Sequence, residues 1–319
     1  MHATATQPHP GLLSPDALGG PVLVASNGVE AFSEALYRAG RRAVMALGGH
    51  IEVLGVVEPL PGVSAGSEVV PVSADLDASR MRNLYDDLQR TVSEAAAGDP
   101  AWPIQILLGS PPRILAREAK RRGASLLVMG IGRHHPLDRL FGAETTLATL
   151  RESTVPILAV GAHFPALPQQ VVVGLDFSVA SQQAAQLALR VLGPGGHLAL
   201  VHVRPRFEEA APDWQAWDTE YGRTLPPLLA QTRAALEIPE GLTIETVVVR
   251  GDPAPALLTY AQQVGADLIA VGTQRHSLVE RLLVGSVATR VLRHAHCGVL
   301  AVPARMTDPV AGHAMPVSR

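Results

Sequence analysis

The stretch GADLIAVGTQR, residues 265–275, decides the fold because the chain carries a second version of it. Residues 123–133 read GASLLVMGIGR, and in both stretches an apolar run leads into a glycine. The two versions stand 142 residues apart. A repeat of this length is a whole domain, because solenoid repeats are only about 20–45 residues long. The sequence therefore predicts two domains of one fold.

The duplication continues on both sides of this stretch. VPILAVG at 155–161 matches CGVLAVP at 297–303 with the same spacing. Nearer the N-terminus, Asn27 matches Asp176 at a spacing of 149 residues. The two copies therefore differ in length in the middle of the unit.

A proline-containing stretch, HFPALPQQ, separates the two copies and suits a linker. Two domains also agree with a chain of 319 residues, at about 150 residues per domain. The predicted organisation is a flexible N-terminal tail at 1–18, a first domain at 19–163, a linker at 164–169, a second domain at 170–304 and a C-terminal tail at 305–319.

Short valine-rich runs alternate with helical segments in the second copy. We predict a loop that holds Trp214 and Trp217, and a helix that begins after Pro226-Pro227. Parallel strands need crossover helices, so the alternation predicts an α/β fold in which helices flank a five-stranded parallel sheet. The other predicted elements are strands at 170–175, 197–203, 242–249, 266–272 and 297–303, and helices at 180–191, 251–265 and 286–294.

Composition narrows the classes of partner. The net charge is −3 and aromatic residues make up 4%, whereas nucleic-acid binding needs a basic surface and often aromatic side chains that stack on bases. No apolar run approaches the roughly 18 residues of a membrane span, and the N-terminus lacks the pattern of a secretory signal. We therefore predict a cytoplasmic protein that binds neither nucleic acid nor membrane.

Ligands of open parallel sheets bind beyond the carboxyl ends of the strands. In the second copy these ends fall at Asp176, Val203, Gly251 and Gly272. A helix that starts near Ser286 would add outward-pointing N–H groups and a partial positive charge, which suit a phosphate. The alternative is structural: Gly272 turns the chain and Ser286 caps a helix.

At these positions the chain resembles the universal stress protein family, over both halves. Nucleotide-binding members carry glycine, two residues, glycine, nine residues, and then glycine followed by serine or threonine. Gly272, Gly285 and Ser286 match this spacing, whereas Arg275 replaces the second glycine. Asp176-x-Ser178 and His202-Val203 also match the ends of the family's first two strands.

The resemblance implies two Rossmann-like, adenine-nucleotide-hydrolase-like domains, and ATP or a related adenine nucleotide in the second, with or without Mg²⁺. Asp176 would lie near the ribose or adenine, and the Val203 backbone would face the adenine edge. The residues expected around the phosphates are Val271, Gly272, Arg275, Gly285, Ser286 and Val287.

Arg275 has a counterpart, Arg133, in the first copy. Three roles remain open for Arg275: a structural ion pair, bidentate hydrogen bonds to the phosphates, or obstruction of the phosphate space. Two histidine clusters, His134-His135 and His294-x-His296, lack further ligands at metal-site spacing, so we expect no metal there. We expect His202, between two valines of a strand, to be a structural histidine.

The first copy lacks the matching chemistry. Asn27 replaces Asp176, and Val56 or Val57 replaces His202. Ala143 and Glu144 replace Gly285 and Ser286, and a carboxylate at a helix start repels phosphate. The first half is therefore predicted to be a non-binding partner.

The resemblance implies a regulator or sensor of stress rather than a fast enzyme, with at most slow ATP hydrolysis. A nucleotide-free scaffold that acts through protein contacts, and a hydrolase or transferase that uses the same pocket, are the alternatives. The resemblance also implies that the last strands, VPILAVG and CGVLAVP, pair the two halves as a pseudo-dimer. A homodimer of whole chains and an unnamed protein partner are left open.

Overall fold

A computed structural model provides the structure of the chain. It describes residues 19–28, 30–60, 63–65, 68–70, 74–96, 98–131, 143–204, 214–273 and 285–304. The predicted tails at 1–18 and 305–319 lie outside these residues.

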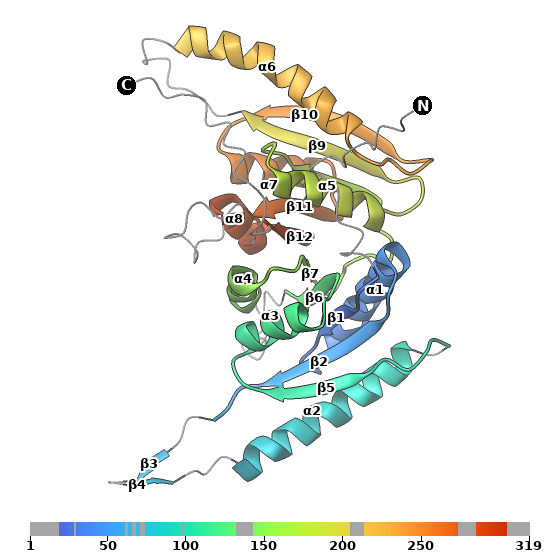
Figure 1. Cartoon of the computed structure of the whole chain (residues 1–319), viewed down its shortest axis with the longest axis vertical. Helices are drawn as coiled ribbons and strands as arrows, with labels where there is room; N and C mark the ends of the chain where they lie inside the picture. Colours follow the sequence, from blue (N-terminus) through green and yellow to red (C-terminus); the bar gives the residue numbers. More distant parts are fainter. Residues whose placement is uncertain are drawn as a thin grey trace, which may run out of the picture.

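Ten strands form one continuous sheet (Figure 1). Its order is β10-β9-β8-β11-β12-β7-β6-β1-β2-β5, so each half contributes five strands that are parallel within that half. This confirms the predicted α/β fold. A separate antiparallel hairpin in the first half was not predicted. The strands are β1 (Val22–Ala25), β2 (Ile51–Val57), β3 (Val63–Ala65), β4 (Glu68–Val70), β5 (Ile104–Leu108), β6 (Leu126–Gly130), β7 (Ile157–Val160), β8 (Gln170–Gly174), β9 (His197–Arg204), β10 (Thr243–Arg250), β11 (Leu268–Thr273) and β12 (Gly298–Pro303).

Helices cover both faces of the sheet. One face carries α1 (Glu30–Leu47), α2 (Ala74–Ala95), α5 (Val179–Val191) and α6 (Trp214–Ala234). The opposite face carries α3 (Pro111–Arg121), α4 (Ala143–Glu152), α7 (Pro253–Gln263) and α8 (Ser286–His294).

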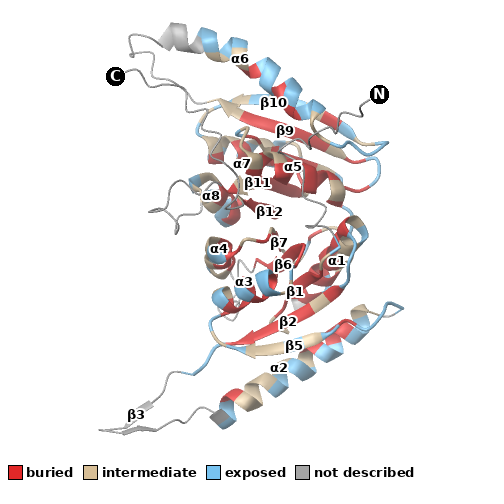
Figure 2. Cartoon of the chain, viewed as in Figure 1, coloured by how far each residue is buried: buried red, intermediate tan, exposed pale blue. Residues whose placement is uncertain are grey.

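Two hydrophobic cores lie on the two faces of the sheet, because successive strand side chains point in opposite directions. In β1, Val22 and Val24 belong to one core, whereas Leu23 and Ala25 belong to the other. The central strands are buried on both faces, as Figure 2 shows. Each core contains residues from both halves of the chain, so the halves share their packing.

The halves join through their last strands, as predicted. β7 and β12 pair antiparallel, with Leu158 opposite Leu300. On one face, the Arg42 guanidinium of α1 donates hydrogen bonds to carbonyls at the C-terminus of α5, including that of Val191 at 2.8 Å. On the other face, Arg293 of α8 pairs with Glu144 of α4, at 2.9 Å between Nε and Oε1.

The helix predicted to begin after Pro226-Pro227 begins earlier, at Trp214, so the predicted loop with Trp214 and Trp217 is wrong. Both prolines lie inside α6 on its exposed side. The carbonyls that lose their partners there can bond to water, while Leu225 and Leu229 stay buried against Leu175. Apolar packing on one side therefore outweighs the cost of proline on the other.

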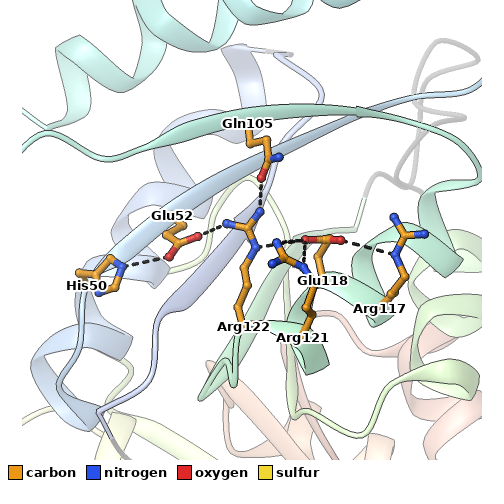
Figure 3. A network of polar contacts seen from close by, with 7 residues as sticks. All are labelled: His50, Glu52, Gln105, Arg117, Glu118, Arg121 and Arg122. Atoms are coloured by element: carbon orange, nitrogen blue, oxygen red, sulfur yellow. Dashed lines mark hydrogen bonds and ion pairs between the residues drawn. The ribbon is translucent and has the colours of Figure 1, made fainter.

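A polar network fastens α3 to the amino-terminal edge of the sheet (Figure 3). At its centre is Glu118, which is only 4% exposed and accepts hydrogen bonds from Arg121 at 2.6 Å and Arg122 at 3.3 Å. Arg122 also contacts Glu52 of β2 and Gln105 of β5. The network lies in the first half, at the start of β2 and β5, whereas the predicted ligand site lies in the second half, so its role is structural.

Glu118→Gln tests this network. The hydrogen bond from Arg121 lowers the pKa of Glu118, so its charged form contributes stability above the unfolded pKa, about 4.3, and this contribution is lost as pH falls through the folded value. We expect the substitution to cost roughly 1–3 kcal/mol at pH 7, and less near pH 3, in urea unfolding. Arg113→Gln, an exposed control 3.8 Å from Glu152, should cost about 0.5 kcal/mol or less. A cost that is the same at both pH values would contradict the assignment.

Candidate functional site

The predicted site residues follow three adjacent strands. β8 lies between β9 and β11, and Gly174 of β8 is level with Val201 of β9 and Val271 of β11. Asp176 and Val203 each lie two residues beyond that level. The structure thus brings these predicted residues to one edge of the sheet, at the carboxyl ends of the strands.

Asp176 belongs to a tight turn between β8 and α5. Its carboxylate is exposed, and Oδ1 accepts hydrogen bonds from the backbone N–H of Ser178 at 3.1 Å and from the Ser178 hydroxyl at 2.5 Å. The Ser178 oxygen in turn accepts from the Ser181 N–H and caps α5. Phe177, between Asp176 and Ser178, has a φ of 63°, which lies in the left-handed region that residues other than glycine rarely adopt. The carboxylate is therefore held in a fixed position at the surface.

Val203 presents its backbone beyond the end of β8. The carbonyl of Val201 accepts a hydrogen bond from the N–H of Leu175 at 2.9 Å, so the backbone groups of Val201 point toward the chain that leaves β8. Backbone groups of a strand alternate in direction, so the N–H and C=O of Val203 point to the same side as those of Val201. At that level β8 has already turned away toward α5. This orientation suits hydrogen bonding to the edge of a planar ligand.

Gly272 has a packing role that the sequence did not reveal. It lies inside β11, so the alternative that it turns the chain is wrong. A Cβ at this position would lie 2.4 Å from the backbone nitrogen of Ser181, in the first turn of α5. Only glycine lets α5 approach the strand this closely. The neighbouring Val271 is 2% exposed, so only its backbone could reach a ligand.

Gly285, Ser286 and Val287 form the start of α8. Gly285 is the N-cap residue, and no described side chain caps the helix there. Ser286 is exposed at the first helical position, and the first turn contains no acidic residue. The outward N–H groups of this turn thus keep the partial positive charge of a helix start. Arg275 and its counterpart Arg133 lie outside the described residues, as do His134 and His135, so the three roles of Arg275 stay open.

His202 is a satisfied structural histidine, as predicted. It is 7% exposed, and its Nδ1–H donates to the Leu175 carbonyl at 2.8 Å. Because Nδ1 carries the proton of the neutral ring, Nε2 is an acceptor. The partner of Nε2 is the hydroxyl of Tyr221 in α6. The Phe177 ring lies 4.8 Å away, between centroids. Burial lowers the pKa of His202, which keeps the ring neutral.

Sequence reasoning did not identify Phe177 and Tyr221 as neighbours of the site. The signal for Tyr221 is its spacing from Leu225 and Leu229, at i, i+4 and i+8, which marks the buried side of α6. Phe177 gave no such signal, because its place depends on the backbone conformation of the turn.

The strand registers correct one comparison between the halves. Val22 pairs with Ile51 in the first half and Val171 pairs with Leu198 in the second. Ile51 therefore corresponds to Leu198, and Gly55, rather than Val56 or Val57, corresponds to His202. In the first half a Cβ on Gly55 would come within 2.5 Å of the Ile106 side chain, so neighbouring aliphatic residues occupy the space that the histidine ring fills in the second half.

The first half also differs at the helix start. Glu144 stands in the first turn of α4, and the hydrogen bond from Arg293 lowers the pKa of its carboxyl. An ionised carboxylate therefore lies where the second half has Ser286. This charge would disfavour a phosphate at α4.

The geometry defines a doubly repeated α/β protein in which the first turn of α4 holds Glu144 and the first turn of α8 holds no acidic residue. A family model described as the universal stress protein family matches residues 20–161 and again residues 168–303. The chain belongs to this family and contains two copies of its domain.

Individual relatives agree with this assignment. A universal stress protein of Mycolicibacterium smegmatis is 26% identical over 283 residues, which cover 86% of this chain and 94% of that protein. Another, from Methanocaldococcus jannaschii, is 45% identical over 62 residues, but the match spans only 36% of its length.

One solved structure shows the same fold over nearly the whole chain. A universal stress protein of Archaeoglobus fulgidus has a TM-score of 0.62 and 18% identity, and the match covers 92% of this chain and all of that one. A universal stress protein solved in complex with cAMP is 28% identical over 42% of this chain and 97% of its own, with a TM-score of 0.31.

Two further findings concern the part of the chain that the structure describes. No helix in it is long and apolar enough to cross a membrane. No group of three or more His, Cys, Asp or Glu residues in it could hold a metal ion.

Stability near neutral pH tests the environment of His202. Because burial lowers its folded pKa, the unfolded chain takes up a proton below about pH 6.5 and the folded chain does not. The contribution of His202 to the stability of the folded state is therefore present above the unfolded pKa and is lost as pH falls toward the folded pKa. We expect thermal unfolding of wild type to show a steeper loss of Tm than His202→Gln between about pH 7.5 and 5.5. Equal slopes would contradict a buried neutral ring.

Proposed function

We propose that the second domain binds ATP or a related adenine nucleotide and that the chain works as a sensor or regulator of stress. The observation that carries this proposal is the start of α8. There Gly285 and Ser286 provide a helix start with no acidic residue in its first turn, whereas α4 of the first half has Glu144 at the same place. Phosphate binding is thus favoured in one half and disfavoured in the other.

The other strand ends supply contacts for the rest of a nucleotide. Asp176 offers an exposed carboxylate to ribose hydroxyls, and the Val203 backbone faces the side where an adenine edge would lie. The backbone around Gly272 and Gly285, the Ser286 hydroxyl and the Val287 N–H would surround the phosphates, with Arg275 beside them. Each helix-start contact contributes about 0.3–1 kcal/mol when exposed, so several contacts together with adenine burial can reach micromolar affinity, about 8 kcal/mol.

Fast hydrolysis is not part of the proposal. His202 is engaged at both ring nitrogens, which leaves it unsuited to act as a general base. The Asp176 carboxylate already accepts two hydrogen bonds from Ser178. It belongs to no group of three or more described His, Cys, Asp or Glu residues that could hold a metal ion. Any Mg²⁺ would therefore be held chiefly by the nucleotide phosphates. We expect the nucleotide to act as a signal that the protein retains.

Calorimetric titration of ATP, ADP and cAMP into the full chain tests the proposal. Ser286→Glu copies the first half, and its carboxylate at the start of α8 should weaken ATP binding at least tenfold by repelling phosphate. Ser93→Glu adds the same charge to an exposed position of α2 and should leave the affinity unchanged. Gly272 is unsuitable for this test because any side chain there would disturb α5.

The outcomes separate the alternatives. If millimolar nucleotide gives neither heat nor a thermal shift, nucleotide binding is excluded. The remaining alternative is then the scaffold that acts through protein contacts. Binding that Ser286→Glu does not change would place the nucleotide elsewhere. In the same titration, Arg275→Gly should weaken binding if the guanidinium contacts phosphate, and should strengthen it if the guanidinium fills the phosphate space. Release of ADP at an appreciable rate would favour the hydrolase.

A further inference from the structure

A cavity of about 700 Å³ that is widely open to solvent lies between α6 and the outer strand β10. Its volume is within the roughly 300–1,000 Å³ of typical small-molecule pockets. None of the nucleotide-site residues that the structure describes is among its lining residues. Apolar side chains form most of its walls and two arginines contribute cationic groups; the lining residues that matter here are Arg204, Leu225, Leu229, Arg233, Thr246 and Val248. In Figure 1, α6 lies along β9 and β10 at the end of the molecule.

The cavity exists because the second half has smaller side chains than the first half beneath this helix. The strand registers place Thr246 and Val248 where the first half has Ile104 and Ile106. Both isoleucines pack into the core that α2 covers. The shorter Thr246 and Val248 leave that space open, and Val248 stays 44% exposed although it is apolar and lies beneath a helix.

The charged groups of the cavity are cationic. The Arg204 guanidinium carbon lies 5.3 Å from the centroid of the Tyr221 ring, a cation–π contact at the end of β9. Arg233 is an exposed residue of the last turn of α6. No carboxylate is among the described lining residues, and the nearby Glu237 pairs instead with Arg190, at 3.4 Å. Cationic groups beside apolar walls complement a ligand that is both anionic and apolar.

We propose that this cavity binds an anionic amphiphile, a molecule with a carboxylate at the end of an unbranched alkyl chain. The alkyl chain lies between Leu225 and Leu229 of α6 and the face of β10 that carries Val248. The carboxylate pairs with Arg233, which can donate bidentate hydrogen bonds to it.

Contacts link the cavity to the proposed nucleotide site. Arg204 stacks on Tyr221, and the hydroxyl of Tyr221 is hydrogen bonded to His202. His202 holds the Leu175 carbonyl, and Leu175 directly precedes Asp176. The amphiphile site nevertheless stands independently of the nucleotide proposal, because its residues and its ligand chemistry are different.

Titration of sodium decanoate into the full chain, below its micelle concentration, tests the proposal. Thr246→Ile combined with Val248→Ile restores bulk at the positions of Ile104 and Ile106, and should weaken decanoate binding at least tenfold without lowering Tm. Thr243→Ile, which adds the same bulk at an exposed position of β10, is the matched control and should bind as wild type does. Arg233→Gln should weaken decanoate severalfold but leave 1-decanol unchanged, whereas Arg250→Gln should alter neither.

Three results would overturn the proposal. Unchanged affinity in the Thr246→Ile, Val248→Ile variant would place decanoate elsewhere. Equal binding of decanoate and 1-decanol would remove the role of Arg233. A wild-type dimer that this double variant dissociates, seen by sedimentation, would make the cavity a contact between two copies of the chain.

Discussion

The antiparallel pairing of β7 with β12 is the contact on which the rest of the molecule depends. Without it, two buried apolar strands would be exposed edges, and each core would end at the boundary of its own half. With it, the ten strands carry two cores that extend through both halves. Arg42 on one face and the Glu144–Arg293 pair on the other reinforce the same junction.

Within this shared frame, a few positions make the two halves chemically different. Glu144 and Ser286 give two equivalent helix starts opposite preferences for an anion. Gly55 and His202 occupy one place in the sheet, yet one is surrounded by aliphatic side chains and the other holds a hydrogen-bonded ring. Both halves nevertheless contribute five parallel strands to the sheet. A duplicated fold can thereby keep one sheet and two shared cores while single positions give its two copies different surface chemistry.

The fold could be predicted from sequence because its signals are periodic: the 142-residue repeat and the alternation of apolar runs with helices. The strand-end residues of the site followed from the same pattern. The early start of α6 could not be predicted, because local proline chemistry points to a break and only the packing of Leu225 and Leu229 overrides it. The correspondence of Gly55 with His202 was missed because the segments between the strands differ in length in the two halves. These differences hide the strand register in the sequence. The packing role of Gly272 depends on how closely α5 approaches it, a distance that spacing along the chain does not encode.

The covalent connection between the halves has a consequence for exchange of partners. Two separate chains that meet through their last strands associate and dissociate according to their concentration. Here the linker keeps both strands at a high effective concentration, so dilution does not separate them. Exchange of one half for a domain of another family member would also require both cores to open at the same time. The pairing of these two halves, with Glu144 at one helix start and Ser286 at the other, is thus fixed when the chain is synthesised, whatever relatives are present around it.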